Sequence, residues 1–174
     1  MQSKRRHQSG FTIVELVITM CIAAILGSIA MAQMRDYTRR ARVSEVVLAA
    51  TTCKNMVAES YPTLDSGSNI PAGGWGCEGT NGATQYAGGV QTSSNGVIRV
   101  AITGLDQNMN GRFVYMVPAK FDGATPMKTP GDLGNGVQAW ICGSDLTYVR
   151  NALPANCRTD TTTYSTEDFA PVLP

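Results

Sequence analysis

Glu15 is the residue whose type and position most need a chemical explanation. It is the only charged residue in the 24-residue apolar run from Phe11 to Met34. A carboxylate inside such a run costs about 2.5–3.5 kcal/mol at the centre of a bilayer, so it has to lie near the membrane interface or meet a cation. Cleavage between Gly10 and Phe11 would create an α-amino group one helical turn from Glu15. We therefore predict that Glu15 pairs with the amino group of an adjacent copy of the chain, and keep an interfacial carboxylate as the alternative.

Four of the five cysteines are placed where disulfides could form. Cys21 lies inside the apolar run, whereas Cys53, Cys77, Cys142 and Cys157 lie in the polar part of the chain. Four cysteines that follow a membrane-competent segment indicate an oxidising compartment and two disulfides. Three connectivities are open at this point.

Residues for catalysis are scarce. His7 is the only histidine and lies in a basic leader, so a chain that loses this leader has no imidazole for general-base or metal chemistry. A lysine would then have to activate a nucleophile. The three lysines beyond the leader, Lys54, Lys120 and Lys128, have no recognisable motif around them. We predict no enzyme activity, no cofactor and no metal site.

One segment matches the opening of a calcium-binding loop. It runs from Asp106 to Gly111 and reads Asp-Gln-Asn-Met-Asn-Gly. The motif requires an acid at its twelfth position, which is Val117 here. Because Asn110-Gly111 lies between two predicted strands, we interpret it as a tight hairpin turn.

The charge balance gives no reason to expect a nucleic-acid partner. Charged residues make up 16% of the chain and the formal charge is +1. Removal of residues 1–10 would take away Lys4, Arg5 and Arg6 and change this charge to −2. Electrostatic binding to nucleic acid requires a strongly basic surface, which this composition does not indicate.

The apolar run is long enough to cross a membrane, since about 20 apolar residues suffice. The basic leader is typical of the cytoplasmic flank of a first span, but four arginines between 35 and 42 balance it, so charge alone does not fix the orientation. Ala30-Met31-Ala32 fits an ordinary signal peptidase site, which would release a protein starting at Gln33. The pattern Gly-Phe-Thr-x-x-Glu is rarer than such small-residue triplets, so we favour a retained helix.

A second helical segment follows the apolar run. Apolar residues recur at intervals of three and four, which predicts one buried face of a helix: Val43, Val46, Ala50, Cys53, Val57 and Tyr61. Pro62 is expected to stop this helix at about Tyr61. Residues 62–95, rich in Gly, Ser, Asn and Thr, read as a long loop that Trp75 and a bridge from Cys53 to Cys77 could fix in place.

Three strands are predicted at 97–103, 112–118 and 137–142 from their β-branched and aromatic residues. They would form a small antiparallel sheet against the amphipathic helix. The fold class is therefore α+β, with a long N-terminal helix that is apolar in its first half and amphipathic in its second. The tail 158–174 reads either as a last edge strand or as a loose segment.

Two stretches resemble the type IV pilins. Residues 10–16 read Gly-Phe-Thr-Ile-Val-Glu-Leu after a basic leader, and residues 36–45 read Asp-Tyr-Thr-Arg-Arg-Ala-Arg-Val-Ser-Glu. Both are similar to segments of major pilins, and a cysteine-closed loop near the C-terminus extends the resemblance. One departure is Ala32, because many of these pilins have a helix-bending proline just before the Asp-Tyr segment.

The resemblance implies three parts and a processing step. Residues 1–10 would be a leader, 11–34 the half of the helix in the membrane or filament core, and 35–174 a surface domain with a sheet at 96–142 and a disulfide loop at 142–157. Prepilin peptidase would cut after Gly10 and methylate Phe11, and Glu15 would act in assembly. The disulfide loop implied by the family joins Cys142 to Cys157.

The function implied is that of a structural subunit. The chain would wait in the inner membrane, polymerise with copies of itself through the assembly machinery there, and form an extracellular pilus for twitching motility, adhesion and DNA uptake. A minor pilin or a pseudopilin of type II secretion shares the leader and helix and is the alternative. A signal-anchored or released periplasmic enzyme or binding module is the alternative from another class.

Overall fold

A computed structural model of the chain describes residues 10–79 and 84–170. Residues 1–9 of the predicted leader and the last four residues of the tail lie outside this range. The chain divides into two compact units, Met1–Tyr37 and Thr38–Pro174. We describe each unit by itself.

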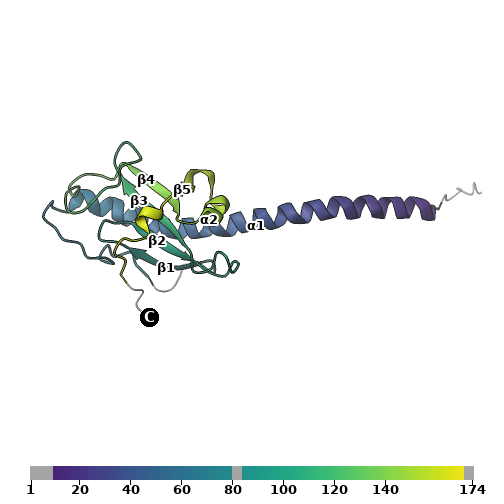
Figure 1. Cartoon of the computed structure of the whole chain (residues 1–174), viewed down its shortest axis with the longest axis horizontal. Helices are drawn as coiled ribbons and strands as arrows, with labels where there is room; N and C mark the ends of the chain where they lie inside the picture. The colour runs from purple at the N-terminus through teal and green to yellow at the C-terminus, as the bar shows by residue number, and fades with distance from the viewer. Residues whose placement is uncertain (1–9, 80–83, 171–174) are drawn as a thin grey trace, which may run out of the picture. The chain divides into compact units, whose positions relative to one another are not determined.

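Helix α1 spans Ile13–Thr63, and its second half supplies one wall of the core of the second unit (Figure 1). Every residue of the predicted stripe is buried, so the helical periodicity is confirmed. The helix passes Ala32 without a break and ends two residues later than predicted. Pro62 has no N–H and so cannot donate a helical hydrogen bond. In the same turn the hydroxyl of Thr63 donates to the carbonyls of Glu59 and Ser60 at 3.2 and 3.0 Å, and these bonds help to complete the last turn.

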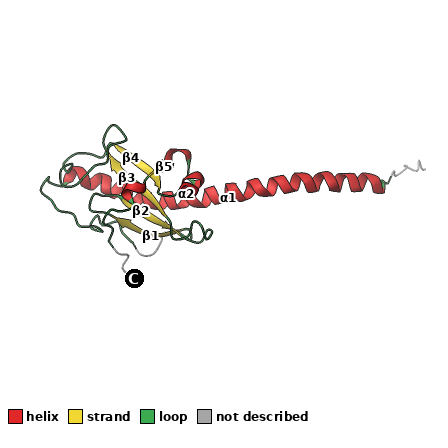
Figure 2. Ribbon diagram, viewed as in Figure 1, coloured by secondary structure: helices red, strands yellow, loops and turns green. Residues whose placement is uncertain are grey.

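The sheet has five strands in the order β1-β2-β3-β4-β5 (Figure 2). Their bounds are Ala87–Thr92, Ile98–Ile102, Phe113–Ala119, Ala139–Ser144 and Thr159–Asp160. The three predicted strands correspond to β2, β3 and β4, which confirms an α+β fold. The sheet is mixed rather than wholly antiparallel, because β5 pairs with β4 in parallel.

Strand β1 corrects the prediction of a loop through residues 62–95. It pairs antiparallel with β2, and its register shifts between Ala87 and Val90, around Gly88-Gly89. A Cβ on Gly88 would lie 3.0 Å from the Cβ of Ala101 on β2. Glycine therefore relieves a tight contact between the two strands. Because glycine also has a low strand propensity, the sequence did not predict this strand.

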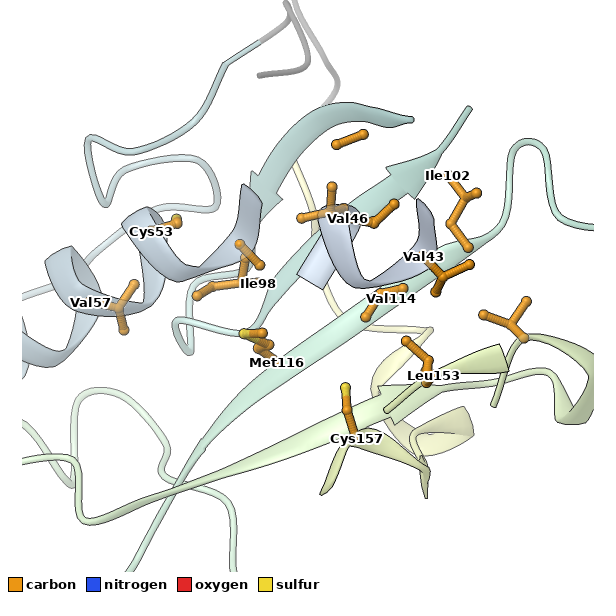
Figure 3. Packing of buried hydrophobic residues seen from close by; sticks show 14 of the residues in the cluster. Val43, Val46, Cys53, Val57, Ile98, Ile102, Val114, Met116, Leu153 and Cys157 are labelled. Carbon is orange, nitrogen blue, oxygen red and sulfur yellow. The ribbon is translucent and has the colours of Figure 1, made fainter. Parts of the chain in front are cut away.

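The core lies between α1 and one face of the sheet (Figure 3). Alternate residues of β2, Ile98, Val100 and Ile102, point to the helix, as the two-residue period of a strand requires. Val114 and Met116 of β3 extend the same face. The buried helix stripe and this face therefore close on each other as two apolar layers.

The other face of the sheet carries a smaller buried cluster. Its members are Val97, Tyr115, Val117, Ala119 and Ile141. The tail covers it: the ring of Phe169 lies 6.3 Å from that of Tyr115, and the Ser93 hydroxyl donates to the Glu167 carboxylate at 2.5 Å. After the short strand β5, the described part of the tail therefore packs over this face of the sheet.

The connection between β2 and β3 is longer than the tight turn predicted at Asn110-Gly111. Ala101 pairs with Phe113, so the chain between the strands runs from 103 to 112. Met109 is fully buried and draws the loop onto the core. The Asp106 carboxylate accepts hydrogen bonds from the N–H groups of Asn108 and Met109 at 2.9 and 3.1 Å, which is a turn-stabilising role.

Candidate functional site

The start of α1 holds Glu15 in a reciprocal cap. Thr12 precedes the first helical residue, and its hydroxyl oxygen accepts the Glu15 N–H at 3.3 Å. The Thr12 N–H and hydroxyl in turn donate to the Glu15 carboxylate at 3.5 and 3.2 Å. This arrangement is a capping box, whose Thr-x-x-Glu signature was present in the sequence and was missed. Glu15 therefore has a local structural role in addition to any role between subunits.

The first half of α1 exposes apolar side chains on all sides. Every residue from 10 to 37 is exposed in the single chain. By length and composition, α1 is the one helix among the described residues that could cross a membrane. A helix that is apolar all round needs lipid or other protein around it. The large exposed residues of this surface are Phe11, Ile13, Val14, Leu16, Val17, Ile18, Met20, Ile22, Ile25, Leu26, Ile29, Met31 and Met34.

Two disulfides lie in the second unit. Cys53 of α1 joins Cys77, and Cys142 of β4 joins Cys157. The first ties the loop before β1 to the buried stripe of the helix. The second encloses helix α2 (Thr147–Ala152) and the 3-10 turn Ala155–Cys157, and so holds the chain before β5 against β4. Cys21 is unpaired and exposed on the apolar part of α1.

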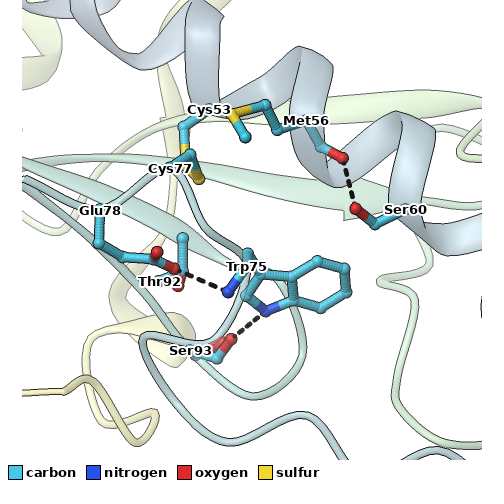
Figure 4. The surroundings of a disulfide bond; sticks show 8 residues. All are labelled: Cys53, Met56, Ser60, Trp75, Cys77, Glu78, Thr92 and Ser93. Atoms are coloured by element: carbon cyan, nitrogen blue, oxygen red, sulfur yellow. Dashed lines mark hydrogen bonds between the residues drawn. A yellow bond between two sulfur atoms is a disulfide. The ribbon is translucent and has the colours of Figure 1, made fainter.

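Trp75 anchors the loop beside the first disulfide (Figure 4). Its indole stacks on Tyr61 with ring centroids 5.2 Å apart, and Nε1 donates to the Ser93 carbonyl at 2.8 Å. Burial raises the pKa of the Tyr61 phenol, and the charges of Asp132 and Glu167 raise it further. Tyr61 therefore stays a neutral donor, and its hydroxyl donates to the Asn95 carbonyl at 2.7 Å.

Glu78 closes the same loop and was missed from the sequence. Its Oε1 accepts the Trp75 N–H at 3.0 Å and the hydroxyl of Thr92. Burial acts to raise the pKa of this carboxyl, but the hydrogen bonds, led by that from Thr92, outweigh burial and lower the pKa below its ordinary value. The ionised carboxylate thus fastens the loop to β1.

We expect Glu78→Gln to lower the free energy of unfolding by about 1 kcal/mol at neutral pH, since a half-exposed charged hydrogen-bond acceptor is replaced by a weaker, neutral one. A folded pKa below the ordinary 4.5 means that this contribution is complete above pH 4.5 and is lost as the pH falls through the folded pKa. Thermal unfolding should show a deficit of about 3–5 °C at pH 7 that becomes smaller at an acidic pH below the folded pKa of Glu78. Glu59→Gln, at an exposed site on α1, is the control. An equal deficit at both pH values would contradict this role.

The residues predicted for assembly and for the disulfides lie in different units. Gly10, Phe11 and Glu15 belong to the first unit, and the four paired cysteines belong to the second. Among the residues the structure describes, no group of three or more His, Cys, Asp or Glu side chains could hold a metal ion. The first unit is thus an exposed apolar helix, and the second unit is a domain cross-linked by two disulfides.

Comparison with known families bears directly on this arrangement. The family model of pilin, a bacterial filament protein, matches residues 39–158, and the prokaryotic N-terminal methylation motif matches residues 5–31. The chain belongs to the pilin family. Pilins are structural subunits of filaments, so the exposed apolar helix and the compact second unit are features of a polymerising protein.

Individual pilins extend the match over most of the chain. The chain is 29% identical over 166 residues to the type IV major pilin protein PilE1 of Neisseria gonorrhoeae, and this alignment covers 92% of the chain and 83% of that protein. It is 30% identical over 144 residues to a fimbrial protein of Neisseria meningitidis serogroup B, covering 80% and 75%. It is 29% identical over 167 residues to the fimbrial protein EcpC of Eikenella corrodens, covering 88% and 93%.

Proposed function

We propose that this pilin is the main structural subunit of a type IV pilus that is assembled from the bacterial inner membrane. The observation that carries the proposal is the all-round apolar surface of residues 11–34 on a chain whose remaining residues form a cross-linked pilin domain. In a bilayer and in a filament core this surface is covered by apolar groups, so the two states have similar hydrophobic free energies. Reversible extension and retraction follow from that balance.

Processing precedes assembly in this account. The methylation motif at residues 5–31 and the Gly10-Phe11 junction support cleavage by prepilin peptidase after Gly10 and methylation of the new Phe11 amine. The first unit would then begin one helical turn before Glu15. The inner-membrane assembly machinery would lift this helix into the growing filament.

Glu15 would set the stagger between neighbouring subunits. When a subunit leaves the membrane, its carboxylate would meet the Phe11 amine of the adjacent copy, and only one axial offset pairs the two charges. Buried ion pairs specify register more reliably than they add stability. The relatives named as major pilins support a major subunit over a minor pilin or a pseudopilin. Twitching motility, adhesion and DNA uptake are the activities such a filament would serve.

The test is deletion of this chain in its own bacterium followed by complementation. We expect surface filaments to disappear, to return with the complementing copy, and to contain this chain as their most abundant protein after shearing. Filaments that persist at normal numbers with the chain present only in traces would instead show a minor pilin.

A further inference from the structure

Arginines are concentrated where the chain enters the second unit. Residues 35–45 contain four arginines and two acids, a local charge of +2 in a chain whose formal charge would be −2 without its leader. Three of these arginines, Arg39, Arg40 and Arg42, belong to the second unit. This segment is therefore net positive, whereas residues 46–174, with seven Lys or Arg and ten Asp or Glu, carry a formal charge of −3.

Tyrosines from elsewhere in the chain border this basic segment. The guanidinium of Arg39 lies 5.2 Å from the ring centroid of Tyr148 on α2, and its Nη1 donates to the Tyr148 hydroxyl at 2.6 Å. The guanidinium of Arg42 lies 5.1 Å from the ring centroid of Tyr86, just before β1. Figure 1 shows α2 beside this part of α1. The rings thus contact the side chains of Arg39 and Arg42, whereas Arg40, Arg42 and Tyr148 are exposed.

We propose that these five residues, Arg39, Arg40, Arg42, Tyr86 and Tyr148, form a docking surface for anionic phospholipid headgroups. We name it the arginine–tyrosine surface. The proposal rests on the membrane-anchored state of the proposed subunit and does not require that filaments form. Tyrosine is enriched at both membrane–water interfaces, and the arginine guanidinium is suited to binding phosphate.

The distance along α1 fits this assignment. Arg40 follows Met34, the last residue of the apolar run, by six residues, or about 9 Å of helix rise. The headgroup layer on each side of a bilayer is about 5–8 Å thick. Arg42 follows Met34 by eight residues, or about 12 Å of helix rise. The long side chains of Arg40 and Arg42 can extend back toward the headgroup layer and bind lipid phosphates through two parallel hydrogen bonds.

Acidic side chains belong to the same region. Asp36 and Glu45 are already included in the net charge of +2 of residues 35–45. Asp106 also faces the surface, where its carboxylate accepts the N–H groups of its own turn and the Tyr148 hydroxyl at 3.3 Å. The loop 103–112 is tied to the same surface, because the Thr103 N–H donates to the Tyr86 carbonyl at 3.0 Å. Docking on a membrane should therefore slow amide hydrogen exchange in the backbone of this loop and of α2.

A functional consequence follows for the anchored subunit. Contacts with lipid phosphates bind the domain to the surface of the bilayer. A subunit that moves from the membrane into a filament has to break these contacts. Membranes rich in anionic lipid should consequently retain the subunit more strongly than zwitterionic membranes do. The lipid composition thereby biases the exchange between the membrane pool and the filament.

The test uses the full chain reconstituted in nanodiscs and measures amide hydrogen exchange. One set of discs contains phosphatidylcholine alone and the other contains 30% phosphatidylglycerol. In the anionic discs we expect exchange at residues 103–112 and 147–152 to slow by about fivefold for each engaged arginine. Addition of about 0.5 M NaCl should remove the effect, because salt screens exposed charges.

Paired variants separate this surface from a general charge effect. Arg40→Gln/Arg42→Gln should abolish the response to phosphatidylglycerol and keep the parental exchange in phosphatidylcholine discs, which shows an intact fold. Lys54→Gln/Lys128→Gln removes the same charge elsewhere; Lys54 likewise lies over an aromatic ring, 5.7 Å from the centroid of Trp140. This control should respond as the parent does.

Three results would overturn the proposal. Exchange that is equal in both kinds of disc would show that the surface does not dock on anionic lipid. A control variant that loses the response as fully as the arginine variant would show a nonspecific charge effect. Equal protection in phosphatidylcholine discs supplied with inorganic phosphate would show a site for free phosphate instead of a lipid surface.

Discussion

Filaments should disappear from cells that make only the Glu15→Val protein, while the protein stays in the membrane and its leader is still removed. Valine favours membrane insertion, so the subunit pool should remain. In the filament, however, the Phe11 amine of each subunit would be buried without its carboxylate. Removal of one partner of a buried ion pair costs about 3–5 kcal/mol, which corresponds to a loss of filament yield of about 100-fold or more. Sheared filaments and membrane fractions, compared by immunoblot, measure both quantities.

The capping box at the helix start requires a matched control. Glu15→Gln removes the charge but retains a side chain that can accept from Thr12 and cap the helix. If the ion pair controls assembly, the Gln and Val variants should fail alike. Abundant filaments from the Gln variant would show that capping, and not pairing between subunits, explains Glu15.

The double variant Cys142→Ala/Cys157→Ala should lose about 3 kcal/mol of stability in the chain-entropy account, since the bond closes a loop with a sequence separation of 15 residues. This loss is a large fraction of the stability of a domain of this size. Denaturant unfolding of the detergent-solubilised chain, followed by the fluorescence of Trp75 and Trp140, measures it. Cys21→Ala, on the exposed apolar helix, is the control and should unfold as the parent does. Non-reducing peptide mapping should link Cys142 to Cys157, and a peptide linking Cys77 to Cys142 would contradict the pairing.

Regular periodicity made the helix and three strands predictable. The stripe from Val43 to Tyr61 follows the helical repeat, and the alternation of Ile98, Val100 and Ile102 follows that of a strand. Strand β1 was not predictable in this way, because the local sequence Gly88-Gly89 suggests a turn, and only the structure shows how closely this segment approaches Ala101 of β2.

The missed features depend on contacts between distant residues. Phe169 covers Tyr115 and the Ser93 hydroxyl donates to Glu167, but no local pattern in the tail predicts either contact. Glu78 likewise acquires its role only when Thr92 is brought to it by β1. In contrast, the capping box of Thr12 and Glu15 is local and could have been predicted from the sequence.

Intact-mass and N-terminal analysis of sheared surface filaments is the most direct test of the claim that this chain is a processed pilus subunit. We expect one dominant species that begins at N-methylated Phe11 and carries two disulfides. A protein that begins at Gln33 would show release by ordinary signal peptidase. Such a result would contradict the account, because the apolar helix that is proposed to form the filament core would be missing.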